Sequence, residues 1–173
     1  MISPYDRNYD RDAFTPPRFD LQKPTVQMLG RWQPWHDGHT ELFKRAHAIT
    51  GQVCIMVRNV SFILGKDAGA GRTGVQDDNP FSYDYVVDEI EDGLHNAGFT
   101  RGTEYVIMAV PNIVDISYGR GVGYTFTEHD LGKDIHDISA TKIREKMRAE
   151  GVLEYTEGTR MDSNYYYMKD PND

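Results

Sequence analysis

Residues 25–58 read TVQMLGRWQPWHDGHTELFKRAHAITGQVCIMVR, and this stretch decides the fold. Thr25–Leu29 is short and mostly apolar, which is typical of a buried strand. In Gly38–Thr50 apolar residues recur at helical spacing, and the following Gly51 favours a helix end. Gln52–Arg58 is again short and apolar. The stretch therefore predicts a strand, a helix and a second strand.

The rest of the chain continues the alternation of strands and helices. We expect a helix that begins at Asn79–Pro80 and ends at Gly98, because Asn caps helices and Pro suits their first position. Tyr105–Val110 predicts a third strand, Tyr124–Thr127 a fourth, and Ser139–Gly151 a last helix. This order predicts an α/β fold with a Rossmann-like, open, mainly parallel sheet and helices on both faces.

The chain divides into three parts, of which the middle one is predicted to be a single domain. Residues 1–24 are polar and hold four prolines, so they predict an extended N-terminal leader. Residues 25–151 form the predicted domain, and residues 152–173 form a polar, Tyr-rich C-terminal tail. Within the domain, the glycine-rich stretch Asn59–Asn79 predicts a mobile loop, because it offers little apolar surface to bury.

The composition excludes several classes of protein. At 173 residues the chain can bury a core, yet no apolar run approaches the roughly 20 residues of a membrane span. A formal net charge of −8 argues against general binding to nucleic acids or anionic membranes. Cys54 is the one cysteine, so no disulfide can form within the chain. We therefore expect a cytoplasmic protein that binds neither nucleic acid nor membrane, with any anion site confined to a local cluster.

The loop after the first predicted strand has the residues of a polyphosphate site. In open parallel sheets ligands bind beyond the carboxyl ends of the strands, where Gly30–His39 lies. The loop leads into a helix start, whose N–H groups and positive dipole end attract anions, and Gly38 allows close approach of the backbone. His36 and His39 stand three residues apart, so both imidazoles can face one anion. A metal site there is disfavoured, since no nearby Cys or third His completes a ligand set.

A second helix start with anion-binding residues follows at Ile138–Arg144, which reads ISATKIR. Ser139 and Thr141 can donate hydrogen bonds to phosphate oxygens. The Arg144 guanidinium can clamp the same oxygens with two parallel bonds. Two such helix starts in one small acidic chain indicate one shared site.

The two motifs resemble the signatures of a known enzyme superfamily. Gly30–His39, GRWQPWHDGH, is similar to GxFxPxHxGH, and Ile138–Arg144 is similar to ISxTxxR, the two signatures of the HxGH nucleotidyltransferase superfamily. The wording most resembles that of the small NMN adenylyltransferases, which read roughly GRFQPFHxGH and ISxTxIR. Trp32 and Trp35 stand where Phe is usual, which keeps the aromatic bulk. The resemblance spans residues 25–151.

The resemblance implies an adenylyltransferase that transfers AMP from ATP to an anionic, phosphate-bearing, NMN-like acceptor and releases pyrophosphate. An acceptor oxygen would attack the α-phosphorus in line, with Mg²⁺ bound to the triphosphate and no covalent enzyme intermediate. His36, His39 and Arg144 would be the catalytic residues, and Ser139 and Thr141 would bind the outer phosphates. The resemblance also implies assembly into homo-oligomers.

Further residues are candidates for the same site. For the nucleotide they are Gly30, Arg31, Gln33, Gly38, Arg120 and Lys142. For the acceptor they are Lys44 and Arg58, on the predicted first helix and at the end of the second strand. A solvent-exposed position explains the basic members of both sets about equally well.

Other functions fit the same motifs. A cytidylyltransferase that makes a CDP-linked precursor shares the fold and the first signature, but its second signature usually differs from ISATKIR. An activity like that of sulfate adenylyltransferase is a third option on this scaffold. A nucleotide-binding regulator without turnover would keep a triphosphate site, but it would not require His36, His39 and Arg144 together. Adenylyl transfer is therefore the leading hypothesis.

Overall fold

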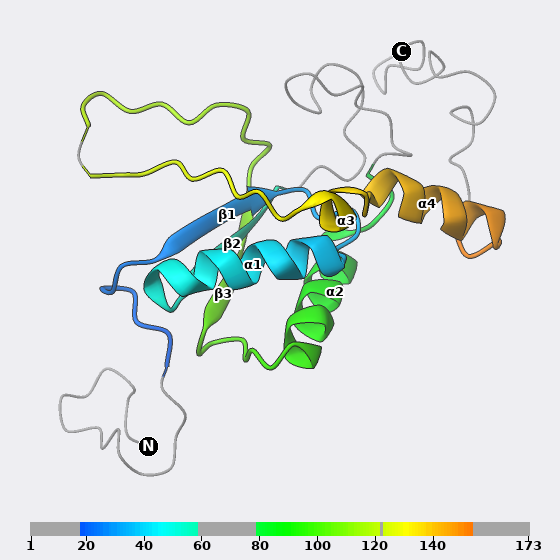
Figure 1. Cartoon of the computed structure of the whole chain (residues 1–173), viewed down its shortest axis with the longest axis horizontal. Coiled ribbons are helices and arrows are strands. Elements are labelled where there is room, and N and C mark those ends of the chain that lie inside the picture. Colours follow the sequence, from blue (N-terminus) through cyan, green and yellow to red (C-terminus); the bar gives the residue numbers. More distant parts are fainter. Residues whose placement is uncertain (1–17, 59–78, 122, 154–173) are drawn as a thin grey trace.

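The computed structural model describes residues 18–58, 79–121 and 123–153. Strands and helices alternate along most of this part of the chain (Figure 1). The elements are β1 (Val26–Gly30), α1 (Asp37–Thr50), β2 (Val53–Arg58), α2 (Tyr83–Asn96), β3 (Tyr105–Val110), α3 (Lys133–His136) and α4 (Ala140–Ala149).

The three strands form one parallel sheet in the order β1-β2-β3. Met28 of β1 pairs with Ile55 of β2, which pairs with Ile107 of β3, so all three side chains lie on one face. The predicted α/β fold with a parallel sheet is confirmed. The carboxyl ends of β1 and β2 lie at the same edge, and the loops that leave there lead toward α1 and α2.

The core lies between one face of the sheet and the two long helices. On β2, every second side chain is buried, beginning with Val53, because alternate residues of a strand point to the same face. α1 contributes Phe43 and α2 contributes Ile90, both fully buried in the same cluster. Full burial of such a side chain stabilises a fold by roughly 1.5–3 kcal/mol, so this face holds the structure together.

The prediction of helices on both faces is wrong for the described residues. The second face of the sheet carries Cys54 and Met56, which are half-buried, and Met108, which is 48% exposed. The strand order explains the difference. Each strand is added beside the previous one in a constant direction, and crossovers of one hand then return on the same side of the sheet. Helices on both faces require the order to reverse.

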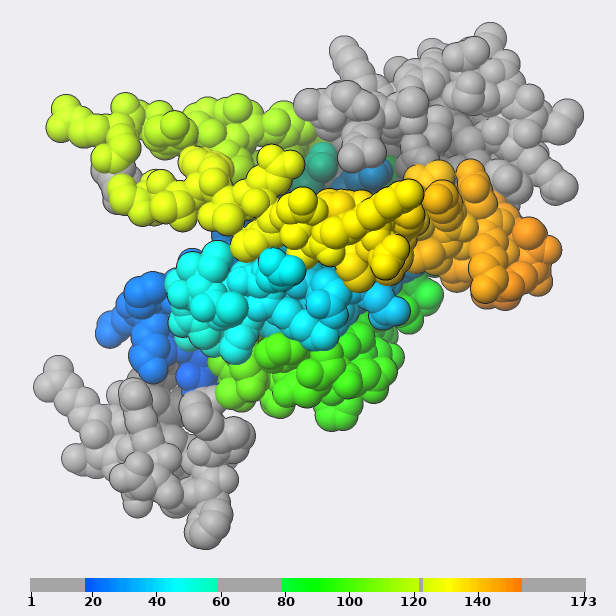
Figure 2. Space-filling view, in the orientation of Figure 1, coloured from blue at the N-terminus to red at the C-terminus, as the bar shows by residue number. Residues whose placement is uncertain are grey.

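The predicted fourth strand at Tyr124–Thr127 is also wrong. These residues form no strand and are exposed, with Tyr124 at 76% and Phe126 at 66%. They belong to an extended excursion, residues 111–132, that projects from the body of the molecule (Figure 2). A further parallel strand requires a crossover of about a dozen residues, usually helical. The described residues between β3 and Tyr124, 111–121 and 123, contain no helix that could pack on the sheet in such a crossover.

Helix boundaries follow local hydrogen bonds. α1 ends where predicted, with Gly51 at φ 84° donating its N–H to the carbonyl of His47. α4 begins after Ser139, whose hydroxyl accepts from the N–H of Lys142. α2 begins at Tyr83 rather than at Pro80, because Ser82 caps it. The short helix α3 was not predicted, since four mostly polar residues carry no periodic signal.

Part of the predicted leader is bonded to the sheet. The buried Gln52 side chain donates to the carbonyl of Asp20 (2.7 Å) and to the hydroxyl of Thr25 (2.6 Å). Its oxygen accepts the N–H of Asp20 at 3.2 Å. Residues 59–78 of the predicted mobile loop, residues 1–17 of the leader and the tail beyond residue 153 lie outside the described residues. Within the described ranges, no helix has the length and apolar composition needed to cross a bilayer.

We expect Gln52→Leu to lower the free energy of unfolding by about 1–3 kcal/mol, because it leaves two buried backbone groups of Asp20 without their partner. Urea unfolding of the full chain measures this change. Gln22→Ala is the control, since Gln22 is exposed and lies only two residues after Asp20. Equal stability of the two variants would show that residues 18–24 do not depend on this contact.

Candidate functional site

The loop from β1 to α1 is packed into the protein. Trp32, Gln33 and Trp35 are each less than a tenth exposed. Trp32 has a φ of 55°, in the left-handed region, and its indole N–H donates to the carbonyl of Met56 on β2 at 3.1 Å. A Cβ on Gly30 would lie 2.8 Å from the Trp32 ring, so glycine is needed there. These contacts hold the loop at the carboxyl edge of the sheet.

The two histidines cap the start of α1. The N–H of Gly38 donates to Nδ1 of His36 at 3.1 Å, and the N–H of His36 donates to Nδ1 of His39 at 3.2 Å. A ring nitrogen that accepts a hydrogen bond carries no proton, so the proton of each neutral imidazole sits on Nε2. The rings stack with centroids 3.6 Å apart. The capping box therefore fixes both tautomers.

Both imidazoles are held neutral by their surroundings. Burial, followed by charge repulsion from the neighbouring His36, lowers the pKa of His39 to about 3. Burial also lowers the pKa of His36, against an opposing effect of the Asp37 carboxylate. At neutral pH each ring is thus a hydrogen-bond donor through Nε2–H and carries no charge.

Two tryptophans enclose the His39 ring. Trp32 meets it edge-on at a centroid distance of 4.8 Å, and Trp35 lies tilted at 5.3 Å. The indole N–H of Trp35 donates to the hydroxyl of Thr40 at 2.9 Å, and this contact is buried. Both tryptophans belong to the hydrophobic core, so they pack the His39 ring against it.

The second motif reaches the same place from the other end of the chain. Arg144, on α4, is only 3% exposed. Its Nη1 donates to the carbonyl of Gln33 at 2.7 Å across 111 residues of sequence, and its Nη2 donates to the hydroxyl of Thr141 at 3.3 Å. The Gln33 side chain exchanges two hydrogen bonds with the backbone of Phe81, at 2.9 and 3.0 Å. Gln33 thus joins both motifs to the start of α2.

The two motifs border one cavity of about 300 Å³. This volume is at the lower end of the range for small-molecule sites. Two arginines and two imidazoles face it, while no residue of its described lining is a carboxylate. The lining residues are Gly30, Arg31, Trp32, Gln33, His36, His39, Ser139, Ala140, Thr141 and Arg144. The polarity of this set suits an anion.

Arg31 lines the cavity and is bound by a hydrogen-bond partner that the sequence did not suggest. Its Nη1 donates to the side-chain oxygen of Asn79 at 2.9 Å. Asn79 is fully buried and lies just before α2, where the sequence indicated only a helix start. The two residues are 48 positions apart, so no local pattern could have paired them. Ala140 and Thr40 were also missed, because neither side chain has a distinctive chemistry.

Gly38 does not line the cavity. A Cβ there would lie 2.9 Å from the His36 ring and 3.6 Å from Ile135 of α3. Its role in the structure is thus to leave room for the imidazole that caps its own N–H, rather than only to admit a ligand. Lys142 lies in the first turn of α4, but its side chain is exposed and outside the lining.

The structure does not bring the other basic candidates to the cavity. Lys44 is exposed on α1 and pairs with Glu41 at 2.6 Å. Arg58, at the end of β2, donates to the side-chain oxygen of Asn112 at 2.6 Å. Arg120 is exposed on the excursion of residues 111–132. Lys44 and Arg120 are thus exposed side chains, as the alternative interpretation expected. Arg58 is instead half-buried in a polar contact.

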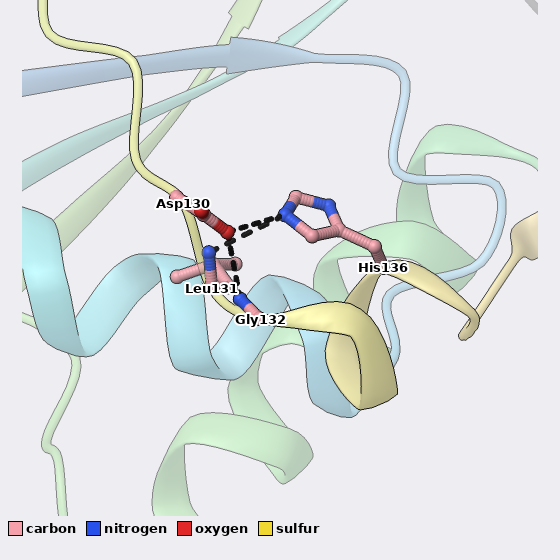
Figure 3. Close-up of polar contacts among 4 residues, drawn as sticks. All are labelled: Asp130, Leu131, Gly132 and His136. Atoms are coloured by element: carbon pink, nitrogen blue, oxygen red, sulfur yellow. Dashed lines mark hydrogen bonds and ion pairs between the residues drawn. The ribbon is translucent and has the colours of Figure 1, made fainter.

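A polar cluster precedes the second motif at the start of α3 (Figure 3). Asp130 accepts from the N–H of Gly132 at 2.9 Å, and its carboxylate lies 3.2 Å from Nε2 of His136. The backbone bond from Gly132 is the main cause of the lowered pKa of Asp130, followed by His136. The cluster is exposed and closes the turn that leads into α3. Among the described residues, no group of three or more His, Cys, Asp or Glu side chains is placed to hold a metal ion.

Comparisons of the chain with protein-family models, curated proteins and solved structures found no significant match. Support for any function therefore comes from the residues themselves and from the geometry of the cavity.

The lowered pKa of His39 predicts a dependence of stability on pH. The unfolded chain takes up a proton on this ring below its ordinary pKa of 6.5, whereas the folded chain does so only near pH 3. Between pH 6.5 and about 3, the free energy of unfolding should therefore fall by about 1.4 kcal/mol per pH unit because of His39. Above pH 6.5 the stabilisation that comes from the neutral His39 ring is fully present.

Chemical unfolding at pH 7.5 and pH 5.5 measures this loss. His39→Gln keeps a neutral polar side chain that does not titrate, so the variant should lose about 1.4 kcal/mol less than the wild type between the two pH values. An equal loss in both proteins would show that His39 titrates normally in the folded state.

Proposed function

We propose that this protein is a nucleotidyltransferase that binds a nucleoside triphosphate in the cavity between the start of α1 and the start of α4. The observation that carries the proposal is the convergence of His36, His39 and Arg144 on one cavity, although Arg144 lies more than 100 residues from the histidines. These residues stand at the positions of the HxGH and ISxTxxR signatures that the two motifs resemble. Resemblance and geometry thus point to the same three side chains.

Two helix starts support a polyphosphate ligand. α1 begins at Asp37 and α4 at Ala140, and residues at both starts line the cavity. The N-terminus of a helix carries a partial positive charge that favours a bound phosphate. Arg31 and Arg144 add two full positive charges to the lining. An otherwise acidic chain thus concentrates positive potential in one place.

The neutral histidines suit the chemistry of the transition state. The acceptor oxygen forms a bond to the α-phosphorus, while the bond from that phosphorus to the leaving pyrophosphate breaks. Negative charge grows on the oxygens of the leaving group as this happens. Nε2–H donors of His36 and His39, already oriented by the capping box, strengthen their bonds as the charge grows, which lowers the barrier.

Arg144 supplies a fixed positive charge to the phosphate site. Its guanidinium is buried and held by the Gln33 carbonyl and the Thr141 hydroxyl, so its orientation is fixed before a ligand arrives. A fixed donor costs less entropy on binding than a flexible one. Ser139 and Thr141 contribute hydroxyls beside it.

A magnesium ion would be held by the nucleotide rather than by the described lining of the cavity. Mg²⁺ prefers carboxylate and phosphate oxygens, and the described lining offers hydroxyls but no carboxylate. The phosphates of the nucleotide would hold the ion, and it would neutralise part of their charge. The protein residues would bind the remaining phosphate oxygens.

Adenylyl transfer to an NMN-like acceptor is the specific reaction we propose, on the wording of GRWQPWHDGH and ISATKIR. Pyrophosphate release from ATP, GTP, CTP or UTP, each with NMN, phosphocholine, glycerol 3-phosphate or sulfate, tests it. We expect release with ATP and NMN above all other pairs. Release with CTP would indicate a cytidylyltransferase, and release with sulfate a sulfate adenylyltransferase. ATP binding without release from any pair would favour a regulator.

We expect His39→Ala to lower kcat by about two orders of magnitude, because a donor to the developing charge is lost. The KM for ATP should change less than kcat. His95→Ala is the matched control, since His95 is exposed on α2 and does not line the cavity. Circular dichroism and the unfolding midpoint establish that the variant is folded. A near-normal kcat would remove His39 from the mechanism.

A further inference from the structure

Gly93 stands at an unusual place for a glycine. It lies inside α2, three residues after Ile90, on the stripe that faces the core. Glycine in a helix interior is less favourable than alanine by about 1 kcal/mol. Its backbone is helical, so no positive φ requires it. A packing reason must therefore explain the residue.

The packing reason is the Trp35 indole. A Cβ on Gly93 would lie 3.0 Å from Cδ1 and 3.1 Å from Nε1 of Trp35, and 3.7 Å from the hydroxyl of Thr40. Contacts this short are tighter than nine in ten real Cβ contacts, so the ring would have to shift by a few tenths of an ångström. Trp35 is only 5% exposed, so it is packed on most of its surface. The backbone of α2 and the indole ring are thus in direct contact.

The indole transmits this contact to the candidate catalytic ring. On its N–H side, Trp35 is fixed by the Thr40 hydroxyl at 2.9 Å. Its ring lies 5.3 Å from the His39 ring, and the Trp32 ring lies 4.8 Å from it. Beside the stacked His36 ring, the His39 imidazole therefore contacts two indoles, one of which lies against α2.

We propose that Gly93 is a positioning residue, which makes room for Trp35 and thereby fixes the His39 imidazole in the orientation that directs Nε2–H into the cavity. Its effect on turnover rests on the proposed function, whereas its effect on the ring does not. A methyl group at position 93 pushes the indole toward His39 or away from Thr40. Either movement disturbs the ring that the capping box orients.

A purely structural role for Gly93 gives different expectations. Alanine favours the helix, so substitution without steric conflict would leave stability unchanged or raise it. We expect Gly93→Ala instead to lower kcat by about 10- to 100-fold with the KM for ATP nearly unchanged, because small displacements of a catalytic group cost rate rather than ground-state binding. Asn96→Ala is the control, since Asn96 is exposed at the end of the same helix.

The direct readout is the titration of the His39 ring by NMR. In the wild type the ring should titrate far below the ordinary range, near the value of about 3 that burial produces. In Gly93→Ala the pKa should rise toward 6.5, as the aromatic enclosure loosens. Thr40→Val removes the acceptor of the Trp35 bond with little change in volume, so it should raise the pKa in the same direction, even if Gly93→Ala folds poorly.

A rescue variant separates positioning from damage to α2. Trp35→Phe carries a smaller ring without Nε1, so the double variant Gly93→Ala/Trp35→Phe should recover part of the kcat lost in Gly93→Ala. Unchanged His39 titration and unchanged kcat in both Gly93→Ala and Thr40→Val would overturn the proposal. If no nucleotide and acceptor pair supports turnover, the proposed function fails, and the titration alone still decides whether Gly93 positions the ring.

Discussion

The site depends on one buried hydrogen bond, from the Arg144 guanidinium to the carbonyl of Gln33. It joins the loop after β1 to a helix more than 100 residues later. Its donor is charged and its acceptor is a main-chain carbonyl, so it cannot be replaced by packing alone. Because the Gln33 side chain also grips the backbone of Phe81, the same residue connects both halves of the cavity to α2.

Local patterns predicted the elements that rely on their own residues. α1 has apolar residues at helical spacing and Gly51 at its end, and both signals are readable within a few positions. β2 alternates between buried and half-buried side chains over six residues. The excursion of residues 111–132 shows the limit of such patterns. Tyr124 and Phe126 alternate with threonines as a strand would, but a strand forms only where another strand offers an edge, and that partner is not encoded nearby.

The candidate site was predicted where the chemistry is local and missed where it is not. Five candidates could be identified from residue type and spacing alone, and all five border the cavity: His36, His39, Ser139, Thr141 and Arg144. Asn79 holds Arg31 only because the fold brings α2 beside the loop, and Gly93 matters only because Trp35 lies against it. Conversely, Lys44 and Arg120 had suitable charge, but the fold turns them to solvent. Charge alone does not determine position.

The capping of α1 by its own two imidazoles makes the first helical turn and the anion site a single cooperative unit. The amide protons of His36 and Gly38 are each bonded to a ring nitrogen, so they can exchange with solvent only when a ring swings away. An anion that binds the opposite nitrogen of each ring opposes that opening. Binding of an anion at Nε2 is thus linked to protection of the amide proton bonded to Nδ1 of the same ring. The rate at which these amide protons exchange therefore becomes a measure of ligand affinity.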